Sequence, residues 1–123
     1  MSQEKIENEI QAKGLNAPRI KPDDIETNIR GEYYFTAADG VAGMCVDGDS
    51  GQCVVQKVKL TELNLLTFCV LVLKNGFTVT GESACASPEN FDPEIGRKIA
   101  RQNAVAKVWP LMGYELRSKL SAS

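Results

Sequence analysis

The sequence predicts an α+β fold: an antiparallel β-hairpin or small sheet packed against a long C-terminal helix, with additional N-terminal helices. Two observations predict it. An apolar run at 65–73, a turn sequence at 74–76 and a second strand-like run at 77–81 indicate the hairpin. Residues 92–109 then show helical periodicity behind a clear helix start signal. Because an isolated hairpin is marginally stable, we expect the helix to cover one of its faces.

Residues 1–14 predict either a short polar helix or a flexible segment. Ser2 is a candidate cap for such a helix, and Gly14 would end it. Only Ile6 and Ile10, four residues apart, give it an apolar side. So few apolar residues do not anchor a helix in a core, and we expect this segment to fray or to depend on a partner.

The remainder, 15–123, is predicted to be one domain, because 123 residues suffice for a single modest core. Pro22 begins a second predicted helix, which would end near residue 30. Three aromatic residues at 33–35 predict a strand that runs into a small-residue turn. Alternate aromatic side chains of this strand are expected to fill the core. The competing interpretation is that one or two of them line a pocket and stack on a planar ligand.

Residues 41–57 are rich in glycine and aspartate, which predicts a flexible loop. The aspartates at 47–49 superficially suggest calcium, but the ligand register and the terminal bidentate glutamate are missing. Cys45 and Cys53 lie in the same loop, and without histidine or a second close pair they make a weak zinc signal. No metal and no cofactor are therefore expected.

The hairpin sequence predicts a two-residue turn at Asn75-Gly76, which would pair Val72 with Val79. One face of the hairpin would then be continuously apolar: Phe68, Val70, Val72, Phe77 and Val79. The helix would meet it with a stripe spaced at about 100° per residue: Ile95, Ile99, Gln102, Ala106 and Trp109, with Val105 at its flank. The predicted core residues are Val70, Val72, Val79, Ile95, Ile99 and Trp109.

The main helix is predicted to begin at the cap Asp92 and to end before Pro110, with a last short helix at 111–120. A second face of it carries Arg97 and Arg101, four residues apart. These arginines would form a solvated face, a close-packed subunit contact or a bidentate anion clamp. On the border of the core face lies Asn103, whose side chain must find hydrogen-bond partners.

The composition excludes several classes of function. The chain has no histidine, and its carboxylates, serines and cysteines form no spacing that suggests an acid–base pair or an activated nucleophile. A binding protein is therefore expected rather than an enzyme. The net charge of −2 and the lack of a basic run argue against nucleic-acid binding. The charged start of the chain has no signal-peptide pattern, and the longest apolar run is about half of a membrane span, so a cytoplasmic protein is expected.

Three motifs in one order carry a resemblance to a known family: NGFTVTGESA, then ENFD followed by EIG, KIA and NA, then a tryptophan, a leucine and GY. With the upstream run NAPRIKPDDIETNIRGEYYFTAADGV they cover residues 16–114. The sequence resembles a family of small tailed-phage and prophage proteins of the podovirus gene 49/gene 66 type. The loop at 41–57 is where members of the family are expected to differ most.

The chain is also similar to the Thoeris anti-defence sponge proteins of phages, in the hairpin turn, the helix motif and the GY ending. This resemblance implies a homo-oligomer in the cytoplasm of an infected or lysogenic bacterial host. It further implies a non-catalytic role: the protein would bind cyclic nucleotide immune messengers, such as cyclic ADP-ribose isomers or cyclic oligonucleotides, and hold them intact. Residues of suitable type in or near the shared motifs are the candidate ligand-binding residues: Tyr33, Tyr34, Asn90, Phe91, Arg97, Arg101, Asn103 and Tyr114.

The alternative is a phage accessory protein that binds and inhibits or modulates a host protein. The polar helix at 2–13 and the aromatic segment at 33–35 would then be the contact surfaces. Loss of a host partner on deletion of residues 1–14 would distinguish this function from ligand binding.

Overall fold

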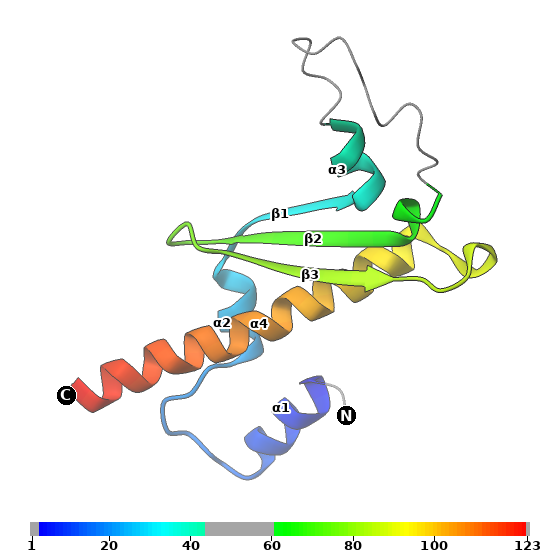
Figure 1. The fold of residues 1–123 in the computed structure, drawn as a ribbon. Helices are drawn as coiled ribbons and strands as arrows, with labels where there is room; N and C mark the ends of the chain where they lie inside the picture. The colour runs from blue at the N-terminus through cyan, green and yellow to red at the C-terminus, as the bar shows by residue number, and fades with distance from the viewer. Residues whose placement is uncertain (1–2, 44–60, 123) are drawn as a thin grey trace.

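The computed structural model describes residues 3–43 and 61–122. Three antiparallel strands form one sheet in the order β1-β2-β3, and a long helix, α4, lies across one face of it (Figure 1). The elements are α1 (Gln3–Ala12), α2 (Pro22–Thr27), β1 (Ile29–Thr36), α3 (Ala37–Gly43), β2 (Leu66–Leu73), β3 (Thr78–Ala84) and α4 (Pro93–Ala122). The predicted α+β fold is confirmed. Ser2, Cys45, Cys53 and most of the predicted loop at 41–57 lie outside the described residues.

The N-terminal predictions hold in part. The first helix forms as α1, and Gly14 follows it with a φ of 66°, a conformation that favours glycine. The second helix was predicted to reach residue 30 but ends at Thr27, because Asn28 caps it and strand β1 begins at Ile29. The backbone carbonyl of Asn28 accepts a hydrogen bond from the Lys74 amide at 3.0 Å, which ties this corner to the hairpin.

The aromatic strand forms as predicted, but the turn expected after it is a helix, α3. Its start is closed by two reciprocal bonds: Asp39 Oδ2 accepts from the Thr36 amide at 2.9 Å, and Thr36 Oγ1 accepts from the Asp39 amide at 3.1 Å. This capping box explains why a run of small residues becomes helical here.

The predicted hairpin register is wrong by one residue. The turn contains three residues rather than two: the Leu73 amide donates to the Phe77 carbonyl at 2.8 Å, and Gly76, at a φ of 88°, donates to the Leu73 carbonyl at 2.9 Å. Leu71 therefore pairs with Val79, and Val72 pairs with Thr78. Since the side-chain period of a strand is two, a one-residue shift exchanges the two faces of β2.

The core consequently uses other residues than predicted. The buried side chains of β2 are Thr67, Cys69, Leu71 and Leu73, while Val70 and Val72 are half-buried on the opposite face. Val79 is buried as predicted, and Trp109 packs against the edge of the core. The main core cluster consists of nine buried residues: Ile25, Cys69, Leu71, Leu73, Val79, Ala100, Ala104, Val105 and Val108.

Helix α4 is rotated relative to the prediction. Its buried residues are Gly96, Ala100, Ala104, Val105 and Val108, whereas Ile95 and Ile99 are 55% and 42% exposed. The face that carries small residues meets the sheet, because short side chains let the helix approach the strands closely. Ile95 and Ile99 of the predicted stripe therefore point away from the sheet, whereas Trp109 packs against the core cluster and Val105, at the flank of the stripe, belongs to it.

Helix α4 also continues through Pro110 to Ala122, where the sequence predicted a break. Proline has no amide hydrogen, so the Ala106 carbonyl loses its usual helical donor. Pro110 lies beyond Val108, the last buried residue of the helix, so this defect falls outside the core contact. Within the described residues, no helix is long and apolar enough to cross a bilayer.

Candidate functional site

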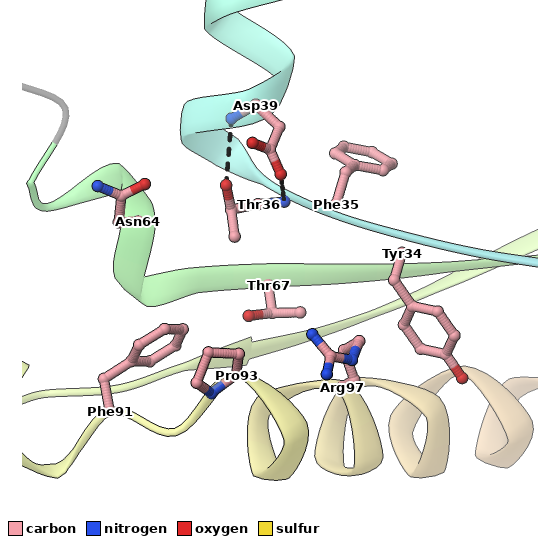
Figure 2. Close-up of a pocket in the computed structure, with 9 residues that line it drawn as sticks. All are labelled: Tyr34, Phe35, Thr36, Asp39, Asn64, Thr67, Phe91, Pro93 and Arg97. Atoms are coloured by element: carbon pink, nitrogen blue, oxygen red, sulfur yellow. Dashed lines mark hydrogen bonds between the residues drawn. The ribbon is translucent and has the colours of Figure 1, made fainter.

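A cavity of about 260 Å³ opens where the end of β1 meets the start of α4 (Figure 2). Four further segments border it: α3, the start of β2, the loop before α4, and the short 3₁₀ helix Leu63–Leu65. The lining residues are Tyr34, Phe35, Thr36, Asp39, Asn64, Thr67, Phe91, Pro93 and Arg97. Segments distant in the sequence thus converge on one small concave site.

The start of α4 forms one wall of the cavity. Asp92 Oδ1 accepts hydrogen bonds from the amides of Glu94 and Ile95 at 2.9 and 3.2 Å, which fixes the first turn as an N-cap does. The preceding 3₁₀ turn, Pro88–Asn90, leads directly to Phe91 in the cavity lining.

Gly96 keeps the inner part of this site open. A Cβ atom added there would lie 3.0 Å from Thr67 Oγ1 and 3.7 Å from Phe91 Cε1. Any side chain at position 96 would therefore press against Thr67 and Phe91.

Among the polar side chains of the cavity, Thr67 and Arg97 have no partner within the described residues, and neither has the exposed amide of Asn64. The Thr67 side chain is 3% exposed, and its Oγ1 makes no hydrogen bond, an uncommon state for a buried hydroxyl. Arg97 projects from α4 toward the strands, and no hydrogen bond or ion pair of its guanidinium is found among residues 3–43 and 61–122 (Figure 2). Asp39, in contrast, is committed to the cap of α3. The cavity therefore offers a hydroxyl and a cation.

Tyr34 contributes its ring to the cavity and its hydroxyl to a separate polar cluster. The hydroxyl donates to Glu32 Oε2 at 2.7 Å, and burial together with this bond raises the pKa of Tyr34. Arg101 binds Glu32 at 2.9 Å and Glu26 at 2.7 Å. Bonds from Tyr34 and then Arg101 lower the pKa of Glu32, so this cluster holds a neutral phenol beside charged partners.

The structure brings three of the eight predicted site residues together in this cavity: Tyr34, Phe91 and Arg97. Tyr33 is 60% exposed and, as the strand neighbour of Tyr34, lies on the opposite face of β1. The amide of Asn103 donates to the Glu82 carbonyl at 2.7 Å, the partner that its border position required.

The remaining predicted residues lie elsewhere. Asn90 belongs to the 3₁₀ turn before Phe91 and is not part of the lining, and Tyr114 is 78% exposed on the far part of α4. Arg101 is occupied by two carboxylates, so Arg97 and Arg101 do not form a joint anion clamp in this structure.

Sequence reasoning missed Thr67, the most unusual residue of the site. A polar residue in an otherwise apolar strand was a usable signal, but the predicted register placed the wrong face of β2 against the helix. Once Leu71 and Leu73 are assigned to the core, the period of two places Thr67 on the same side, under the start of α4.

Residues 20–120 match the family described as Phage protein (N4 Gp49/phage Sf6 gene 66) family. No curated protein matches the chain significantly, and neither does any solved structure.

Proposed function

The chain thus belongs to the phage protein family of N4 Gp49 and phage Sf6 gene 66, and on this premise we propose that it is a non-catalytic anti-defence protein. In this role it binds cyclic nucleotide immune messengers in the cytoplasm of the infected host and withholds them from their effector. The observation that carries the proposal is the cavity in which an unpaired arginine, an unpaired hydroxyl and aromatic rings converge.

Each of these groups suits one part of a cyclic nucleotide. Arg97 supplies a planar cation for a phosphate. The rings of Tyr34 and Phe91 supply faces against which a base can stack. Thr67 Oγ1 supplies a buried donor and acceptor for a ribose hydroxyl or a base edge, and binding would satisfy it.

The size of the cavity limits what it encloses. Ligand pockets commonly measure about 300–1,000 Å³, so a volume of about 260 Å³ suits one nucleotide unit. The rest of a cyclic dinucleotide or cyclic ADP-ribose would lie at the open mouth.

The same geometry favours binding without turnover. The one carboxylate of the lining, Asp39, already accepts the Thr36 amide in the α3 cap, which leaves it poorly placed to act as a general base. The bound messenger would then leave chemically unchanged.

A ligand panel tests the proposal. Cyclic ADP-ribose, cyclic di-AMP and cyclic di-GMP are each added to the purified protein, and the melting temperature and the binding isotherm are measured. At least one ligand should raise the melting temperature, and mass spectrometry after heating should recover it intact. Failure of all three, or recovery of a hydrolysed product, would reject the role.

Matched variants connect the binding to this cavity. Arg97→Gln should weaken binding at least tenfold, since it removes a charge-assisted bond worth about 1.5–3 kcal/mol. Gly96→Ala should also weaken it, by narrowing the space beside Thr67. Arg117→Gln, on the exposed far part of α4, is the control and should bind like the wild type.

One observation favours a second candidate function, the binding of a host protein. Tyr33 and Phe35 are 60% and 39% exposed on β1, and Ile6 is 45% exposed on α1. Deletion of residues 1–14 should then abolish retention of one stoichiometric host protein without changing ligand binding.

A further inference from the structure

The face of α4 that points away from the sheet carries a continuous repeat. Its positions alternate in steps of four and three residues along nearly the whole helix: Ile95, Ile99, Gln102, Ala106, Trp109, Gly113, Leu116 and Leu120. This is the spacing of the a and d positions of a coiled coil, the pattern by which two helices pack along one seam. The seam extends over about 38 Å at 1.5 Å per residue.

Much of this seam is uncovered. Ile95, Ile99 and Leu120 are 55%, 42% and 42% exposed. None of the residues of α4 after Val108 is buried, and Figure 1 shows this part of the helix, drawn in orange to red, extending past the sheet. An exposed apolar repeat on a helix that projects from its own domain indicates an interaction surface.

Beside the middle of the seam lies a groove of about 820 Å³ between α4 and α1. Ile6 and Ile10 of α1 line one side of it, and Ala106 and Trp109 of α4 line the other. No residue of α1 is buried, so this helix does not close the groove by packing. The lining also contains the charged residues Glu4, Glu7, Arg19, Glu26 and Arg101. Its apolar part is of a kind that suits another helix with an apolar stripe.

We propose that the α4 helix of a second copy occupies this seam in antiparallel orientation, with the two-fold axis between Ala106 and Trp109. The two-fold then places Ile95 opposite Leu120 of the other copy and Ile99 opposite Leu116. It places Gln102 opposite Gly113 and Ala106 opposite Trp109. The two long side chains in the centre of the seam therefore each face a small residue: Trp109 faces Ala106, and Gln102 faces Gly113.

Size complementarity also selects the orientation. In a parallel pairing, Trp109 would face Trp109 of the other copy, and Gly113 would face Gly113 of the other copy. The tryptophan layer would contain a clash and the glycine layer a void. In the antiparallel pairing a positions meet d positions throughout, and Val105 flanks Met112 of the other copy. The interface is isologous, as closed two-fold dimers require.

One feature of the seam opposes association. Lys98 would lie near Lys119 of the other copy at each end. Glu94 and Glu115 moderate this repulsion, because each is paired with the lysine of its own helix at 3.4 and 3.6 Å. Added salt should therefore strengthen the dimer modestly rather than weaken it.

The dimer surface lies on α4 and outside the ligand cavity, so it goes beyond the proposed function. The resemblance to sponge proteins implied an oligomer without indicating a surface for it. The seam provides that surface, and it leaves the cavity at the start of α4 on the side of the sheet.

Opposite charges introduced at two facing positions of the seam test the proposal. The association state is measured by sedimentation velocity at micromolar protein concentration. The wild type should sediment as a dimer, and Ile99→Lys and Leu116→Glu should each reduce it to a monomer. The variant that carries both substitutions should dimerise again, because the antiparallel seam places each new lysine opposite a new glutamate. Leu111→Lys, an exposed leucine of α4 outside the seam, is the control and should remain a dimer.

Each alternative result overturns the inference. A monomeric wild type or single substitutions that remain dimeric would exclude the seam. A double variant that stays monomeric would exclude the antiparallel register. Unchanged thermal unfolding of the single variants, measured by circular dichroism at low concentration, separates loss of the dimer from loss of the fold.

Discussion

Gly81 of β3 lies directly against the backbone of Ala100 in α4. A Cβ atom added at Gly81 would overlap the Ala100 carbonyl oxygen and the Ala104 amide nitrogen. Strand and helix therefore touch through their backbones, and the absence of a side chain on the strand sets their separation. This contact explains why α4 turns its alanines, rather than its isoleucines, toward the sheet.

Substitution at this contact should be costly. Gly81→Ala should reduce the free energy of unfolding by about 3 kcal/mol, the upper range for overpacking, because the neighbouring atoms are backbone and cannot rotate away. Urea denaturation measures the loss. Gly43→Ala, where an added Cβ meets nothing within 4 Å, is the control and should change stability little. An equal effect of both substitutions would contradict the close contact.

The observed strand register predicts a contrast between two valines. Val79→Ala should reduce the free energy of unfolding by about 2 kcal/mol, because Val79 is 7% exposed and faces α4. Val72→Ala should cost less than about 1 kcal/mol, since Val72 is half-buried on the other face. The two-residue turn would put both valines on one face, so equal losses in thermal or urea unfolding would support that register instead.

The cluster around Arg101 should make stability depend on pH. The pKa of Glu32 is lowered by the Tyr34 hydroxyl and then by Arg101. A lowered carboxyl pKa contributes stability that is fully present above its usual value of 4.5 and is lost as the pH falls through the lower folded value.

Removal of the Arg101 guanidinium should therefore reduce both the free energy of unfolding and its dependence on pH. Arg101→Gln should cost about 1 kcal/mol at neutral pH, a value discounted because Glu26 and Glu32 remain partly in water. The acid limb of a plot of unfolding free energy against pH should become shallower than in the wild type. An unchanged limb would show that Arg101 does not stabilise the Glu32 carboxylate.

Helix α1 should detach in acid before the core unfolds. Arg19 holds Glu7 through two bonds of 2.8 Å, and these bonds, with one from Gln11, lower the pKa of Glu7 to about 2. The tether is present in full above the ordinary pKa of glutamate and is lost as the pH falls through about 2. Trp109, the single tryptophan, lines the groove beside α1 and reports its release as a red shift of fluorescence.

Arg19→Gln provides the control for this transition. Its emission should already be red-shifted at neutral pH, while the far-ultraviolet circular dichroism of the remaining fold is retained. If its emission matches that of the wild type at neutral pH, α1 is held by other contacts.

The sequence predicted most kinds of elements correctly, the exceptions being the turn that is helix α3 and the break expected at Pro110. It also failed where two elements had to be oriented against each other. The cap at Asp92, the strand at 33–35 and the apolar strand at 66–73 depend on local signals that tertiary packing does not change. The strand register depended on the length of the turn. A three-residue turn closes the hairpin at Leu73 and a two-residue turn closes it at Lys74, and an Asn-Gly sequence suits both lengths.

The rotation of α4 shows a second limit. Hydrophobic periodicity favoured the stripe with the largest apolar residues, yet close packing on Gly81 favoured the stripe with the smallest. Both stripes are apolar on one helix, so periodicity alone could not rank them. For the site, residue type identified Tyr34, Phe91 and Arg97, but it could not show that Arg101 is occupied by Glu26 and Glu32.

The unsatisfied hydroxyl of Thr67 places folding and binding in conflict. A buried donor without a partner lowers the stability of the free protein, whereas an apolar side chain of the same shape avoids that loss. Thr67→Val should therefore raise the free energy of unfolding by about 1 kcal/mol, and it should weaken the binding of any ligand that fills the cavity. Selection for stability alone would replace this threonine, so a variant that gains stability and loses binding would identify Thr67 as a residue retained for function.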